Sequence, residues 1–134
     1  MTPFGAKLRE LRAQHGITQA QLADRLQISA AYLSALEHGR RGMPSTGLVH
    51  QICAELDLIW DAAEEMLTLA RLSHPRVTVN TAGLSAEQTA LANRIAQTIA
   101  RLPPAVVADL HAVLDTVPTA AKPRVRRAAG RAIE

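Results

Sequence analysis

Two short helical segments separated by only two residues constrain the fold of this chain more than any other feature. The segments cover residues 19–26 and 29–38, and in each the apolar residues recur at helical spacing. Thr18 precedes the first segment, and a glutamine three residues later completes a capping-box pattern. Ser29 can cap the second segment. The pattern predicts two short helices joined by a tight turn, with the inward-facing residues Leu22, Ala23, Leu26, Leu33 and Leu36.

Three further helices are predicted around this pair. A first helix over residues 4–15 ends at Gly16, a residue type that commonly ends helices. After a loop rich in glycine and proline, Ser45 or Thr46 begins a fourth helix. A fifth helix covers about residues 59–72. Its predicted inward face consists of Trp60, Ala63, Leu67 and Ala70.

A different pattern begins after His74 and Pro75. Residues 76–81 alternate valine with polar residues, which is typical of a strand. Ser85 then begins a capping box, and two consecutive prolines divide the following apolar residues into two predicted helices. These form a predicted helical hairpin whose apolar stripes are Leu91, Ile95, Ile99 and Leu102, then Val106, Leu110, Val113 and Val117. We expect a first domain over residues 1–74, an accessory region over 75–117 and a basic, mobile tail over 118–134.

Composition and charge narrow the class of protein. Three aromatic residues among 134, with alanine and leucine dominant, favour an all-α fold. Residues 1–41 carry six basic and three acidic side chains, residues 42–74 one basic and five acidic, and the tail from Lys122 five basic and one acidic. A chain with such separated charge can orient on a polyanion, although solvated helix faces would give the same pattern.

The sequence excludes or disfavours several other classes of protein. The lone Cys53 rules out an internal disulfide, and with His50 it supplies only two ligands, too few for a zinc site. We find no catalytic constellation, phosphate-binding loop, signal peptide or apolar run long enough to span a membrane. The sequence therefore predicts a cytoplasmic protein that is not an enzyme and needs no cofactor or metal.

The chain resembles the XRE family, the helix-turn-helix regulators of the phage repressor and Cro type, over about residues 4–72. The matching blocks follow one another at the family spacing: Leu8 to Arg12, Gly16 to Gln19, Gln21 to Ala23, Leu26, Ile28 and Ser29, Tyr32 to Glu37, Gly39 to Arg41, and Pro44 with Ser45. The resemblance implies a five-helix domain that binds operator DNA, commonly as a dimer.

The resemblance also implies roles for individual residues. Gln19 matches a glutamine that approaches a DNA phosphate at the start of the first motif helix. Arg12 and Glu37 match a pair that forms an internal ion pair, with two independent surface charges as the alternative. The full set of expected DNA-contacting residues is Thr18, Gln19, Ser29, Ala30, Ala31, Tyr32, Ser34, Ala35, His38, Arg40 and Arg41.

Two positions depart from the family. Gln27 stands in the turn where relatives often have glycine, so a residue with a side chain is expected at positive φ. Ala30, Ala31 and Ala35 occupy outward positions where relatives often carry longer polar side chains, and alanine cannot hydrogen-bond a base edge.

We therefore expect a sequence-specific regulator of double-stranded DNA, in most cases of this family a repressor of one or a few promoters, its own among them. Two helices with exposed apolar stripes are too few to enclose a core, so we expect a homodimer on a pseudo-palindromic operator. Residues 76–81 would then pair with the same segment of a second copy or form a plain linker. The alternative function is a protein-binding module on the same fold, an antitoxin or antiactivator that grips its partner with the C-terminal helices.

Overall fold

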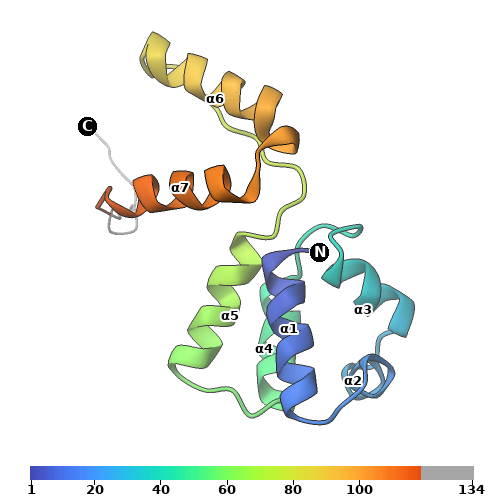
Figure 1. Cartoon of the computed structure of the whole chain (residues 1–134). Helices are drawn as coiled ribbons and strands as arrows, with labels where there is room; N and C mark the ends of the chain where they lie inside the picture. The colour runs from blue at the N-terminus through green and yellow to red at the C-terminus, as the bar shows by residue number, and fades with distance from the viewer. Residues whose placement is uncertain (119–134) are drawn as a thin grey trace, which may run out of the picture. The chain divides into compact units, whose positions relative to one another are not determined.

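The computed structural model describes residues 1–118 of the 134, and those residues are all-α (Figure 1). They contain seven α-helices and one short 3-10 turn, and no strand. The elements are α1 (Pro3–Gln14), α2 (Gln19–Leu26), α3 (Ala30–Glu37), α4 (Thr46–Glu55), α5 (Asp61–Arg71), α6 (Ala86–Thr98), η1 (Ile99–Arg101) and α7 (Pro104–Asp115). The chain divides into a first unit, Met1–Thr78, and a second that begins at Val79.

Helices α1 to α5 of the first unit surround one apolar core. α1 packs on α3 and α5, α2 on α3 and α4, and α4 on α5. The core residues are Phe4, Leu8, Leu11, Ile17, Leu22, Ala23, Leu26, Leu33, Leu36, Leu48, Val49, Ile52, Cys53, Leu56, Met66 and Ala70. The five predicted helices and the inward residues predicted for the second and third are confirmed, because apolar spacing and capping residues agree along this part of the chain.

The start of α1 is fastened to the ends of two other helices. The Thr2 amide donates to the Glu37 carbonyl oxygen at 3.0 Å, and the Phe4 amide donates to Ser73 Oγ at 3.0 Å. The buried Ser73 hydroxyl in turn donates to the Leu69 carbonyl oxygen at 2.6 Å. Gly5 lies directly against the Glu37 backbone, and a β-carbon there would overlap the Glu37 carbonyl group. The first amides of α1, which have no partner within the helix, are therefore used to join α1 to α3 and α5.

The predicted inward face of the fifth helix is wrong at its first residue. Trp60 precedes α5, has a φ of +52° and leaves 82% of its surface exposed. Met66 and Ala70 are the buried residues of α5, and Ala63 and Leu67 pack partly against the core. α5 begins two residues later than predicted. Trp60 therefore lies before the helix, and the helical spacing does not bring its side chain to the inward face.

The strand-like segment forms no strand within the described part of this chain. Residues 76–81 form no ladder with any described part of the chain, because alternation alone supplies no partner for the backbone groups. In addition, α6 ends at Thr98, so Ile99 lies in the 3-10 turn rather than in the helix.

The second unit contains helices that bury no residue. Ser85 and Gln88 form the predicted capping box of α6, and Pro104 occupies the first turn of α7. Neither α6 nor α7 has a buried side chain, and the two helices make hardly any contact with each other. The predicted hairpin is thus two helices with open apolar faces. The predicted basic tail from Lys122 lies outside the described residues.

Within residues 1–118, no helix is long and apolar enough to cross a membrane.

Candidate nucleic-acid interface

The α2–turn–α3 unit is built by capping interactions at both helix starts. The Thr18 amide donates to Gln21 Oε1 at 2.8 Å, and the Gln21 amide donates back to Thr18 Oγ1 at 3.0 Å. Ser29 Oγ accepts from the Tyr32 amide at 3.0 Å. Because α2 ends at Leu26 and the Ser29 cap fixes the start of α3 at Ala30, the connection between the two helices is confined to residues 27–29.

Gln27 makes the turn itself. Its φ of 60° and ψ of 39° are left-handed, and the next amide, of Ile28, donates to the Ala23 carbonyl oxygen at 3.0 Å. This closes α2 in the way glycine usually does. The positive φ expected without glycine is confirmed, and it reverses the chain between α2 and α3.

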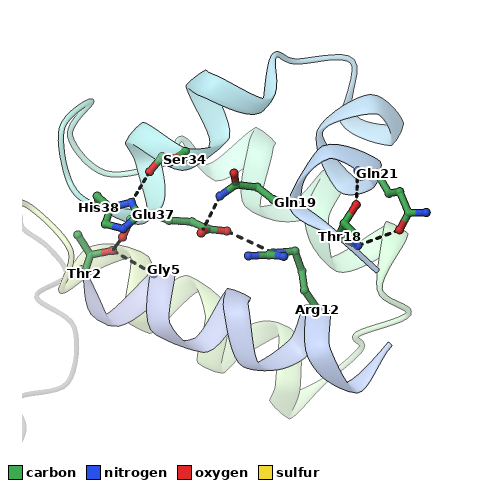
Figure 2. A network of polar contacts seen from close by, with 9 residues as sticks. All are labelled: Thr2, Gly5, Arg12, Thr18, Gln19, Gln21, Ser34, Glu37 and His38. Carbon is green, nitrogen blue, oxygen red and sulfur yellow. Dashed lines mark hydrogen bonds and ion pairs between the residues drawn. The ribbon is translucent and has the colours of Figure 1, made fainter. Parts of the chain in front are cut away.

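A buried carboxylate joins three helices behind this unit (Figure 2). Glu37, the last residue of α3, has no exposed surface. Its Oε1 accepts from Gln19 Nε2 of α2 at 3.0 Å, and its Oε2 lies 3.4 Å from Arg12 Nε of α1. The structure therefore brings together Arg12, Gln19 and Glu37, which are far apart in sequence.

The Arg12–Glu37 contact is an ion pair without an aligned hydrogen bond. Neither Arg12 Nε nor Glu37 Oε2 has a hydrogen-bond partner among the described residues. The Arg12 side chain is only 12% exposed, so water screens the pair weakly. A charge buried this way depends on its partner, because an uncompensated carboxylate in the interior is strongly destabilising.

The outer face of α3 is small and uncharged. Ala30 and Ala31 are exposed, whereas Tyr32, Ser34 and Ala35 are half-buried. Ser29, Ala31, Tyr32, Ala35 and Arg41 line one shallow hollow of about 300 Å³. The Arg41 guanidinium lies 5.2 Å from the centre of the Tyr32 ring, a distance at which a cation is attracted to the ring face.

The remaining expected residues lie at the two ends of the unit. Thr18 is exposed at the start of α2, and His38 and Arg40 are exposed after the end of α3. His38 Nδ1 lies 2.9 Å from the Ser34 carbonyl oxygen, which holds the ring beside α3. Ser29 and Arg41 are also exposed, so most of the eleven expected residues are accessible to a ligand.

Sequence reasoning missed two features of this site. The resemblance assigns Gln19 to a DNA phosphate, and it gives no sign that the Gln19 amide nitrogen donates one of its hydrogens to the Glu37 carboxylate. Ser73, whose hydroxyl holds the start of α1, carries no local signal, because its partner Phe4 is 69 residues away.

Within residues 1–118 the structure offers neither a reactive cysteine nor a metal centre. Burial raises the pKa of the Cys53 thiol, so the thiol stays protonated at neutral pH and is a poor nucleophile. In the part of the chain that the structure describes, no group of three or more histidine, cysteine or acidic side chains is arranged to hold a metal.

Comparison with known proteins identifies the family. A family model described as a helix-turn-helix domain matches residues 3–76, more than half of the chain. The chain belongs to this helix-turn-helix family. The family consists of XRE-like transcriptional regulators, which are not enzymes.

The curated relatives that the chain matches are also described as transcriptional regulators. The chain is 39% identical over 61 residues to the Uncharacterized HTH-type transcriptional regulator RghRB of Bacillus subtilis (strain 168), covering 46% of this chain and 44% of that protein. It is 34% identical over 61 residues to the HTH-type transcriptional repressor RghR of the same strain, covering 46% and 45%. It is 36% identical over 74 residues to the Transcriptional regulator ClgR of Mycobacterium tuberculosis (strain ATCC 25618 / H37Rv), covering 52% and 65%.

The match thus spans about half the length of the first two relatives, and less than two thirds of the third. No solved structure matches the chain.

The buried pair generates a stability prediction. Arg12→Met should lower the free energy of unfolding by about 3–5 kcal/mol, because it leaves the Glu37 carboxylate buried without its cation. The double variant Arg12→Met/Glu37→Leu should regain most of that loss, since no buried charge remains. Arg9→Met, at an exposed position of the same helix, should change stability by no more than about 0.5 kcal/mol. Urea unfolding of the four proteins measures these differences, and a double variant less stable than Arg12→Met would contradict the account.

Proposed function

We propose that this chain binds double-stranded DNA sequence-specifically and represses transcription from one or a few promoters. The observation that carries the proposal is the outer face of α3. That helix is backed by buried Leu33, Leu36 and Glu37, while the opposite side carries small exposed residues and no covering element in the first unit. A helix is about 10–12 Å wide with its side chains, which fits the major groove of about 12 Å.

The residues around α3 support a phosphate-contacting rim. The exposed Thr18 hydroxyl lies at the start of α2, where the helix dipole favours a negatively charged group and a hydroxyl can donate to a phosphate oxygen. Arg40 and Arg41 lie beyond the other end of the unit and are exposed. Contacts of this kind position a protein on the duplex without reading its sequence.

We assign the reading of the DNA sequence to the small residues of α3. Ala30, Ala31 and Ala35 offer methyl groups, which pack well against the thymine methyl and let the helix approach the groove floor. Ser29 and Ser34 supply hydroxyls that donate to or accept from a base. We therefore propose half-sites with thymine opposite the alanines, and a contribution from DNA shape at base pairs that no side chain contacts.

A repressor role is supported by the kind of relative that the chain matches. One of those relatives is described as a transcriptional repressor, although the match covers less than half of it. A protein seated in the major groove over a promoter blocks the same DNA to other proteins. We extend this to the present chain as part of the proposal, with its own promoter among the targets.

We also propose that the chain works as a homodimer through α6 and α7. Nine large apolar residues in and beside these two helices are exposed: Leu91, Ile95, Ile99, Val106, Val107, Leu110, Val113, Leu114 and Val117. Apolar surface left in water costs about 25 cal/mol per Å², so covering this face is favourable. The eight residues of α3 span about 12 Å, which corresponds to roughly four base pairs, and a second copy doubles the length of DNA that is read.

The DNA proposal is tested with a labelled duplex of mixed sequence and fluorescence anisotropy. The full chain should bind, and log K should fall with log salt by roughly 0.9 for each phosphate contacted. Arg40→Ala/Arg41→Ala should weaken binding to every duplex alike and reduce the salt dependence. The matched control Arg94→Ala/Arg101→Ala removes the same charge from exposed positions of the second unit and should have no such effect. Absence of binding by the wild type at low salt would overturn the proposed function.

The dimer proposal is tested by sedimentation equilibrium of the full chain. Leu91→Asp and Val113→Asp place a charge in exposed apolar faces of α6 and α7, so they should weaken self-association at least tenfold while the helix content remains unchanged. Asn93→Asp adds the same charge to another position of α6 and should leave the dimer intact. A monomeric wild type would contradict the proposal and would favour a different protein as the partner of these helices.

A further inference from the structure

A basic hollow lies beside the loop that follows α3. It is lined by Gly39, Arg40, Gly42, His74, Pro75 and Arg76 and has a volume of about 520 Å³. Residues 39–42 and 74–76 are distant in sequence, but Pro75 packs near Gly39, where a β-carbon would lie 3.7 Å from Pro75 Cβ. The residues after α5 are therefore held against the end of the α3 loop.

The ionisable side chains that line this hollow are all basic. Arg40, His74 and Arg76 line it, and no carboxylate does. An adjoining hollow of about 480 Å³ shares His74 and Arg76 and adds Arg71. None of these four side chains forms an ion pair with another residue in the range 1–118. Basic groups that converge on one space without an acidic partner favour an anion there.

The backbone keeps the hollow open. Gly39 and Gly42 have φ values of +81° and +79°, a conformation that glycine adopts without strain. Any side chain at Gly39 would also press on Thr2, whose methyl carbon would lie 3.0 Å from the added carbon. Without side chains at these two positions, a bulky anion can approach Arg40 and Arg76 together.

We infer that this hollow binds a phosphate group of the DNA backbone, so that His74 and Arg76 extend the interface beyond α3. The inference rests on the proposed function. Gly39, which lines the hollow, comes two residues after the end of α3, and Arg41, the neighbour of Arg40, contacts Tyr32 of α3. Arginine pairs well with phosphate because its planar guanidinium donates two parallel hydrogen bonds.

The test compares Arg76→Gln with Arg94→Gln in the full chain, using duplex binding at a series of salt concentrations. Each variant loses one positive charge, but only Arg76 lines the hollow. Arg76→Gln should reduce the slope of log K against log salt by about 0.9, the value for one phosphate, and weaken binding at 0.1 M salt roughly fivefold to tenfold. Arg76→Lys should keep most of the wild-type slope, and Arg94→Gln should leave the slope unchanged.

The outcomes separate this inference from the proposed function. If the wild type binds DNA and Arg76→Gln has the same slope as Arg94→Gln, the DNA contact is refuted while the proposed function stands. Titration with inorganic phosphate, followed by NMR of the His74 ring, then distinguishes the source of the anion. Saturable shifts that Arg76→Gln abolishes, without any effect on DNA binding, would assign the hollow to free phosphate and overturn the inference. A wild type that binds no duplex would refute the proposed function and this inference with it.

Discussion

The Glu37 carboxylate is the interaction on which the mutual arrangement of α1, α2 and α3 depends. It ends α3, accepts from Gln19 of α2 and faces Arg12 of α1. The backbone carbonyl of the same residue accepts from the Thr2 amide, and Gly5 packs on it without room for a side chain. One residue thus fixes α3 against α1 and α2. A buried charge is costly, but it permits few alternative positions of its helix, and a helix that reads bases must be held within a fraction of an ångström.

Much of the first unit was predictable because local signals and the apolar pattern agree there. Thr18, Ser29 and Ser45 cap helices in the structure, and Gly16 and Gln27 adopt the left-handed conformations that end them. Each of these signals acts within four residues of chain, so the sequence contains everything needed to place the boundary. The second unit follows the same rule at Ser85 and Pro104, where a capping box and a proline begin helices.

The features that escaped prediction depend on residues far apart in sequence. Trp60 has helical spacing to the apolar residues of α5, yet it precedes the helix, where the chain turns and leaves it exposed. The Gln19 amide binds a carboxylate 18 residues away, and Ser73 binds an amide 69 residues away. The basic hollow likewise forms only when residues 74–76 return to the end of α3. Tertiary packing decides such contacts, and a single sequence without related sequences carries no direct signal for them.

The central claim is that the exposed face of α3 reads DNA, and selection of bound duplexes from a random pool tests it most directly. The wild type and Ala31→Gln are compared, because Ala31 is exposed and the change adds a side chain able to pair with adenine. The account predicts an enriched inverted repeat for the wild type, with thymine opposite α3. It also predicts that Ala31→Gln changes the preferred base at one position of each half-site while non-specific affinity remains the same. Identical enriched sequences from the two proteins, or no enrichment from the wild type, would contradict it.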